Sequence, residues 1–323
     1  MNAASTKDVP ASTAVAASHR PKPSVLGLSL VTVLLIWSFN YVAGKIALRH
    51  IDALSLASLR MELSALLILP VYFAQFRRRT PLQARKIGMF FYLGFFGVFI
   101  NMGCFTVGLS MTTSEHSVVI MAMGPILVLL LASAWKLEKL TLAKGVGMMI
   151  SFLGVILLET ERGASLHSPF LLGDFIILCS ISGFAFYATL AKRVVAGYDA
   201  LSLNTYNILA AATLMLPLAI WQGIHLHWGA VGWAGWAGMA YMSGCSTVIS
   251  YTLFNWVLRY MDPSRVAAIN YVQPVIVILI SIPFLGEHPT GHLLSGAALV
   301  LLGVYLAERA GLAERLGWAE GAH

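Results

Sequence analysis

The chain has 323 residues, of which 58% are hydrophobic and 11% charged, and its mean hydropathy is +0.79. A soluble domain carries about 25% charged residues, so this composition excludes a large soluble protein and indicates lipid as the solvent. The net charge of +7 does not predict a nucleic-acid partner, because the cytoplasmic loops of membrane proteins are rich in Lys and Arg.

The N-terminal residues 1–25 are rich in Ala, Ser, Thr and Pro, and we expect a disordered cytoplasmic tail there. Apolar runs then follow one another, and a bilayer core needs about 20 apolar residues per helix. The sequence therefore predicts an all-α integral membrane protein. Its ten transmembrane helices are expected at about 26–48, 54–75, 87–109, 114–135, 142–158, 172–195, 201–221, 233–257, 264–285 and 291–308.

An internal duplication runs through the chain. In its later part, equivalent residues are 149 positions apart: Pro125 and Pro274, Glu138 and Glu287, Thr141 and Thr290, Gly147 and Gly296, Gly154 and Gly303, Glu159 and Glu308. In its earlier part the offset is 147: Lys45 and Lys192, Pro70 and Pro217, and the segments that start at Asp52 and Asp199. Constant offsets over so many positions predict that the first five helices recur as the last five.

Five is an odd number of crossings, so the two copies must traverse the membrane in opposite senses. This predicts an inverted-topology repeat, which is the architecture of many secondary transporters. We expect the first five-helix repeat at 26–158, an external linker at 159–171, the second five-helix repeat at 172–308 and a cytoplasmic tail at 309–323.

The orientation follows from the distribution of positive charge. Seventeen Lys and Arg residues fall on the side of the N-terminus, and four fall on the other side. Because cytoplasmic segments hold the excess of Lys and Arg, we expect a multi-pass protein of the plasma (inner) membrane with both termini in the cytoplasm.

Two prolines and several polar side chains lie near the middle of their spans. Proline removes a backbone hydrogen bond, so Pro125 and Pro274 predict helix kinks around a central cavity, although packing kinks are an alternative. Intramembrane polar residues are functional candidates, but they also serve interhelical hydrogen bonds. The residues expected to line a substrate cavity are Trp37, Asn40, Asn101, Tyr187, Asn255, Asn270 and Gln273. Such a cavity is rich in aromatic and amide groups, with few fixed charges.

Charged and small residues near the span ends give further expectations. Glu115 and His116 begin the fourth helix, where they are candidates for proton coupling or a simple acidic first turn. Glu138 and Glu287 favour a structural role, such as capping the fifth or tenth helix. Small faces on these two helices permit close packing, within the chain or in a homodimer; they are formed by Gly145, Gly147, Gly154, Gly296 and Gly303.

No metal or cofactor is expected. The three cysteines, Cys104, Cys179 and Cys245, lie in different apolar runs without metal-ligand spacing. His225 and His227 are two ligands where a zinc site needs three or four. The chain also lacks the Walker A pattern, so we expect movement of solute to be driven by a gradient.

The combination of these motifs resembles the drug/metabolite transporter superfamily, in particular its EamA-like branch. That family marks each repeat with a mid-helix Pro and a terminal Glu, as in Pro125 with Glu138 and Pro274 with Glu287. The aromatic and polar cluster from Trp37 to Tyr41, followed by Lys45, is also typical. Arg60 matches an Arg often found in the family's second helix, whereas its repeat counterpart is Asn207.

The resemblance covers about residues 26–308 and implies export or exchange of a small metabolite, amino acid or drug-like solute. We therefore expect a secondary active transporter that works by alternating access, with efflux as the favoured direction. The partners are then a small-molecule solute and membrane lipid. The alternatives are an importer or exchanger of the same fold, a membrane-embedded lipid-modifying enzyme, and a receptor or scaffold.

Overall fold

The computed structural model describes residues 21–75, 80–135, 141–160, 169–261, 272–287 and 289–315, together with Pro263, Val266 and Asn270. These residues contain helices and connecting turns and no strand. Glu138 and most of the expected linker and tails lie outside the described residues.

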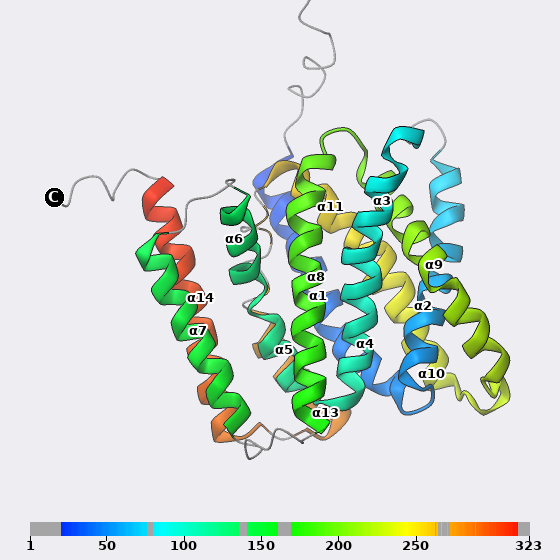
Figure 1. Cartoon of the computed structure of the whole chain (residues 1–323). Helices are drawn as coiled ribbons and strands as arrows, with labels where there is room; N and C mark the ends of the chain where they lie inside the picture. The colour runs from blue at the N-terminus through cyan, green and yellow to red at the C-terminus, as the bar shows by residue number, and fades with distance from the viewer. Residues whose placement is uncertain are drawn as a thin grey trace, which may run out of the picture.

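The ten predicted transmembrane helices are confirmed (Figure 1). In the first repeat the crossings are α1 (Pro23–Leu48), α2 (Ala53–Ala74), η2 (Ala84–Lys86) with α3 (Ile87–Gly94), η3 (Phe95–Ile100) and α4 (Asn101–Met111), α5 (Ser114–Met121) with α6 (Gly124–Ala134), and α7 (Leu142–Thr160). In the second they are α8 (Pro169–Val194), α9 (Ala200–His225), α10 (Trp233–Ala240) with η5 (Tyr241–Ile249) and α11 (Ser250–Tyr260), α13 (Gln273–Leu285), and α14 (Gly291–Arg315). A short turn, η4 (Trp228–Ala230), precedes α10.

Six helical segments are long and apolar enough to cross a membrane, and shorter apolar helices accompany them. Their outward surfaces are apolar as well, with exposed side chains such as Leu35, Leu66 and Leu279. Two boundaries differ clearly from expectation: α9 extends to His225 and α14 continues to Arg315. The segment expected as a tail from residue 309 is therefore helical at its start.

Equivalent helix ends in the two repeats are stabilised in the same way. Asp52 caps α2 by accepting a hydrogen bond from Ser55 N, and Asp199 caps α9 by accepting one from Ser202 N, both at 2.9 Å. An N-cap of this kind satisfies one of the free N–H groups of the first turn. The two caps lie at opposite faces of the bundle, because α2 and α9 run in opposite directions (Figure 1).

Two equivalent lysines, one in each repeat, donate hydrogen bonds to carbonyls at helix C-termini. Lys45 Nζ donates to the carbonyl of Thr112, where α4 ends. Lys192 Nζ donates to the carbonyls of Leu258 and Met261, at 2.8 and 2.7 Å, where α11 ends. A cation at a helix C-terminus satisfies free carbonyls and complements the helix dipole. The inverted relation of the repeats is thus visible in individual hydrogen bonds.

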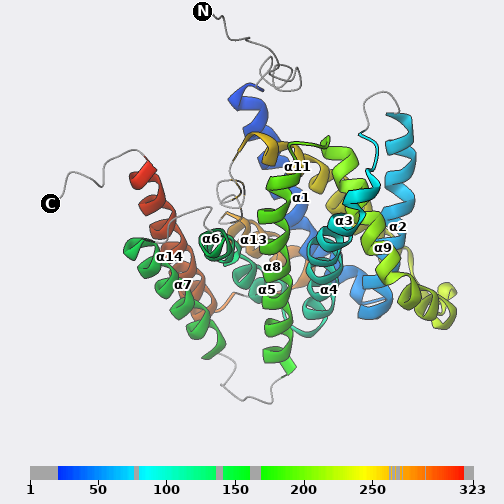
Figure 2. The same ribbon diagram turned by 45° about the horizontal axis from the view of Figure 1, so that its top comes forward.

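The fifth helices of the two repeats, α7 and α14, pack side by side along their length (Figures 1 and 2). A Cβ added to Gly154 would come within 2.8 Å of the Gly296 carbonyl oxygen. A Cβ added to Gly303 would clash in the equivalent way with the backbone of Gly147. Small residues allow membrane helices this close approach. The expected small faces therefore meet each other within one chain.

Gly145 does not belong to this interface, because a Cβ added there meets nothing within 4 Å. The interface also contains a hydrogen bond from Ser151 Oγ to the Val300 carbonyl, at 2.9 Å. We refer to these packed faces of α7 and α14 as the glycine seam; its residues are Gly147, Ser151, Gly154, Gly296, Val300 and Gly303.

Substitution within the glycine seam tests this packing. Gly303→Ala places a methyl group against backbone that cannot move aside, and we expect it to lower the free energy of unfolding by about 1–3 kcal/mol, as overpacking does. Gly145→Ala on α7 is the matched control and should be neutral or stabilising, because alanine favours a helix by about 1 kcal/mol over glycine. Denaturant titration of both variants in mild detergent measures the difference. Equal stability of the two variants would contradict close packing at Gly303.

Candidate functional site

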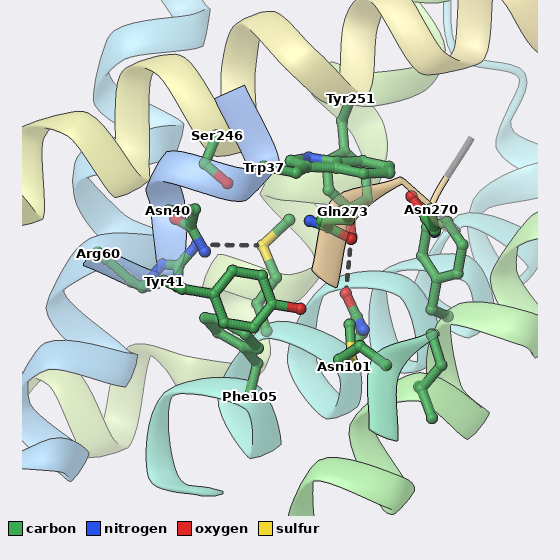
Figure 3. A pocket seen from close by; sticks show the side chains of 14 residues that line it. Trp37, Asn40, Tyr41, Arg60, Asn101, Phe105, Ser246, Tyr251, Asn270 and Gln273 are labelled. Atoms are coloured by element: carbon green, nitrogen blue, oxygen red, sulfur yellow. Dashed lines mark hydrogen bonds between the residues drawn. The ribbon is translucent and has the colours of Figure 1, made fainter. Parts of the chain in front are cut away.

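A cavity lies between the two repeats (Figure 3). Its walls come from α1, α2, α4 and α5 of the first repeat and from α8, η5, α11 and α13 of the second. The lining residues are Trp37, Asn40, Tyr41, Arg60, Asn101, Met102, Phe105, Met121, Ile181, Phe184, Ser246, Tyr251, Asn270 and Gln273.

The cavity is narrow in this conformation. Its empty space is about 480 Å³ when open solvent is counted, and the centres of water-sized molecules fit into about 50 Å³ of it. One water needs roughly 10–15 Å³ by the latter measure. The walls therefore enclose only a few waters, and a larger solute requires the helices to move apart.

Five of the seven residues expected at the cavity are in its wall: Trp37, Asn40, Asn101, Asn270 and Gln273. Tyr187 and Asn255 are not among the lining residues, which corrects their placement. Both are completely buried, and the Tyr187 hydroxyl donates a 2.7 Å hydrogen bond to Asn255 Oδ1. This hydrogen bond joins α8 to α11 behind the cavity wall, while Asn255 Nδ2 has no partner among the described residues.

Asn101 lies in the wall, but its amide is already bonded within the protein. Its Oδ1 accepts from the Tyr251 hydroxyl at 2.7 Å, and its Nδ2 donates to the backbone carbonyl of Ser180 at 2.9 Å. The Ser180 hydroxyl donates back to the Asn101 carbonyl at 2.7 Å. This network joins α4, α8 and α11, and such a satisfied buried network makes the wall rigid.

Other polar atoms in the wall have no hydrogen-bond partner among the described residues. They are Asn40 Oδ1, Asn270 Oδ1 and the Tyr41 hydroxyl, although each side chain is more than nine-tenths buried. Buried polar groups are nearly always hydrogen-bonded. These groups are therefore the ones that water or a bound solute can satisfy.

One wall of the cavity is aromatic. The Trp37 ring contacts Phe184, Tyr251 and Phe254, with ring centroids 5.5–5.7 Å apart. Edge-to-face and tilted contacts of this kind are favourable for aromatic pairs. Figure 3 shows Trp37 lying over Gln273 in the middle of the view, with Arg60 and Asn40 on one side and Asn270 on the other.

Arg60 is the charged residue among the cavity residues that the sequence analysis did not assign to it. The side chain is only 1% exposed. Its guanidinium donates to Thr106 Oγ1 at 3.1 Å and to Thr247 Oγ1 at 3.2 Å. We expect few fixed charges in the cavity, and its wall contains one, the Arg60 cation. A lone Arg within the apolar run of α2 was the signal available in the sequence.

Pro125 and Pro274 mark breaks between helical segments, not bends within a continuous helix. Each lies in the first turn of a new helix, α6 or α13, where the missing N–H costs no helical hydrogen bond. The carbonyls that these prolines leave without their usual donor belong to the residues four positions earlier. Those residues, Met121 and Asn270, both line the cavity. The two breaks therefore border the cavity from opposite repeats.

The third helix of each repeat contains a π-helical segment at the equivalent place, η3 and η5. Such segments often occur at functional sites. Asn101 follows η3 directly, and Ser246 lies within η5. Both residues line the cavity. A π-helical segment changes the direction in which the following side chains point, and here it does so next to the cavity wall.

Glu115 and His116 lie outside the cavity lining and form part of a separate buried cluster. Their side chains are 5% and 4% exposed, and Glu115 lies in the first turn of α5. His116 Nδ1 lies 3.8 Å from Asp174 Oδ2 on α8, and Ser281 Oγ of α13 lies 3.5 Å from Glu115 Oε1. We call Glu115, His116 and Asp174 the acid–histidine cluster. The sequence analysis missed Asp174.

Glu287 also acts on α5. Its Oε1 accepts a hydrogen bond from the backbone N–H of Ser114, the first residue of that helix, at 3.2 Å. The expected capping role is thus found at the fourth crossing rather than the fifth or tenth. Within the described residues, no group of three or more His, Cys, Asp and Glu side chains is arranged to hold a metal ion.

Comparison with known proteins agrees with this architecture. The chain is 25% identical to an "uncharacterized transporter" of Archaeoglobus fulgidus, over 87% of this chain and 97% of that protein. It is 24% identical to the "probable amino-acid metabolite efflux pump" of Salmonella typhimurium, over 87% of this chain and 93% of that pump. A solved crystal structure that is 17% identical superposes with a TM-score of 0.63 over 91% of this chain and 99% of its own, which supports the fold.

The model of the EamA-like transporter family matches the chain twice, at residues 26–160 and 171–309. The two matches together span most of the sequence, and they confirm the resemblance found in the sequence motifs. The chain is a multi-pass membrane protein that belongs to the EamA-like transporter family.

Proposed function

We propose that this protein is a secondary active transporter that moves a small metabolite or amino acid out of the cell across the plasma membrane by alternating access. The observation that carries the proposal is the cavity, whose walls come from both inverted repeats. Such repeats can exchange between two related packings around a central site. The narrowness of the cavity favours the same view, because a solute can enter only when the repeats move.

The chemistry of the wall supports a solute with both apolar and polar parts. The aromatic wall around Trp37 offers flat apolar contact, and the open amides of Asn40 and Asn270 offer hydrogen bonds. Efflux is the direction that the name of the Salmonella pump suggests for that relative. Import or exchange by the same fold is the alternative. A lipid-modifying enzyme would instead form product in detergent, without a sealed compartment.

The export proposal is tested by comparing the small molecules in the growth medium of cells that express different variants at equal membrane abundance. Solutes enriched outside by the wild type should fall about fivefold with Gln273→Ala, since a lost hydrogen bond costs about 1 kcal/mol. Leu279→Ala on the same helix is the matched control, because that side chain is 64% exposed on the outer surface. Depletion of solutes from the medium would indicate import, and identical media for all strains would contradict transport through this cavity.

We further propose that both termini lie in the cytoplasm. The charge distribution supports this orientation, and the described basic residues Lys86, Lys192 and Arg259 share the face at which α1 begins.

Cysteine labelling tests the orientation, in a background in which Cys104, Cys179 and Cys245 are replaced by Ala. Gln83→Cys and His227→Cys place exposed thiols at opposite faces of the bundle. An impermeant thiol reagent should label His227→Cys in intact cells and Gln83→Cys only after the membrane is opened. The reverse labelling pattern would overturn the orientation.

We also propose that the acid–histidine cluster couples transport to protons. Two carboxylates and an imidazole lie within the membrane-spanning part, and His116 Nδ1 lies within ion-pair distance of Asp174 Oδ2, at 3.8 Å. Two further charged groups bind at this end of α5, Glu287 to Ser114 N and Lys45 to the Thr112 carbonyl. Intramembrane ionisable residues of this kind form the proton relays of pumps and transporters.

Asp174→Asn tests the coupling, with the exported solute as the readout in proteoliposomes. The variant should abolish the acceleration of transport by a pH gradient, while solute exchange without a gradient continues. Asp199→Asn is the matched control, because asparagine caps a helix as well as aspartate does. An unchanged response to the pH gradient in Asp174→Asn would contradict coupling at this cluster.

A further inference from the structure

Arg60 is a positive charge placed deep within the membrane-spanning bundle. It lies seven residues after the start of α2, which is about 10 Å along the helix at 1.5 Å per residue. The side chain is 1% exposed and forms part of the cavity wall. A charge in this position is costly and marks a functional site in most membrane proteins.

The contacts of Arg60 within the protein are all with neutral groups. Besides Thr106 and Thr247, the guanidinium approaches the Met242 carbonyl at 3.5 Å and the Met102 sulfur at 3.8 Å. Among the described residues, no carboxylate lies within ion-pair distance of it. The Nε–H has no hydrogen-bond partner there. The described part of the chain therefore holds the cation in place without neutralising it.

A buried cation without a counter-charge favours the binding of an anion. The surroundings of Arg60 limit the class of anion that can bind. Threonine hydroxyls occupy two of the five N–H donors of the guanidinium, so part of it remains for a solute. The cavity wall contains one formal charge, Arg60, and otherwise neutral side chains. A singly charged carboxylate balances this charge, whereas a phosphate dianion would leave excess negative charge. Arginine pairs well with carboxylates because its donors match their planar geometry.

The rest of the cavity indicates what accompanies the carboxylate. Trp37 lies over Gln273, with Arg60 on one side and Asn270 on the other (Figure 3). A solute with its anionic group at Arg60 would therefore place its apolar part against Trp37 and Phe184. Asn40 and Asn270 have open amide oxygens, and these accept hydrogen bonds from donor groups such as an ammonium.

We propose that the solute carries a single carboxylate, which binds Arg60 from the cavity, and an apolar or aromatic body that packs on Trp37. This proposal rests on the transport function proposed above and specifies its substrate class. The solutes it describes are small monocarboxylates, including amino acids with apolar side chains.

The test compares acids with their neutral amides, using the purified full-length protein in lipid nanodiscs. The probes are 3-phenylpropionate with 3-phenylpropanamide, L-phenylalanine with L-phenylalaninamide, and butyrate with butyramide. Thermal denaturation at increasing concentrations of each probe gives the apparent affinity. At least one acid should raise the Tm of the wild type and bind at least tenfold more tightly than its amide. Equal binding of acids and amides, or no binding of any acid, would overturn the proposal.

Variants of Arg60 separate binding from structural support. Arg60→Gln should weaken the binding of the acid at least tenfold, and Arg60→Lys should retain part of it because the charge remains. Arg49→Gln is the matched control, since Arg49 is exposed at the end of α1 and outside this cavity. If Arg60→Gln does not fold, two other measurements test the proposal. They are the ratio of acid affinity to amide affinity in the wild type and the acid affinity of Arg60→Lys. Unchanged affinity in a folded Arg60→Gln would overturn the proposal.

The two proposals fail in different ways. Export of solutes without a carboxylate, found in the growth medium, would contradict the substrate class and leave the transport function intact. Binding of acids through Arg60 without any change in the medium would contradict transport and leave the binding site intact.

Discussion

The hydrocarbon core of a bilayer offers no water to backbone N–H and C=O groups, so the chain must satisfy them itself. The ten helices do this along most of their length, and side chains do it at the ends. Asp52 and Asp199 serve N-termini, and Lys45 and Lys192 serve C-termini. Irregular backbone at membrane depth is tolerated only where it is buried in protein or borders a cavity. The breaks before Pro125 and Pro274 meet this condition.

The repeats are alike where they support structure and different where they surround the cavity. The glycine seam contains equivalent contacts from both copies. In contrast, Arg60 lines the cavity, whereas its counterpart Asn207 is fully buried and donates a 3.4 Å hydrogen bond to Tyr187. In the proposed function, the symmetric scaffold would provide two related packings, and the asymmetric residues would determine which solute binds.

Much of the fold could be predicted because four residue types indicate local structure directly in the sequence. Pro marks helix breaks, Gly marks close helix packing, Asp marks N-caps and Lys marks helix C-termini. The direction in which a mid-span side chain points is set by helix packing and is not visible there. Asn40 and Asn255 are both amides within apolar runs, yet only Asn40 reaches the cavity. The π-helical segments alter the helical phase in two crossings, so simple 3.6-residue periodicity does not place their residues. Asp174 was missed because it lies near the expected start of its span, where a charge is ordinary.

The cation in the cavity wall gives the empty and the filled protein different electrical properties. An empty cavity contains one uncompensated positive charge at Arg60, and a bound monocarboxylate without an ammonium group cancels it. A membrane potential does work only on net charge, about 2.3 kcal/mol for one charge moved through 100 mV. For such a solute, the voltage acts on the rearrangement of the empty protein and not on the loaded one. In the proposed transport cycle, the membrane potential would therefore change the rate at which the empty protein returns.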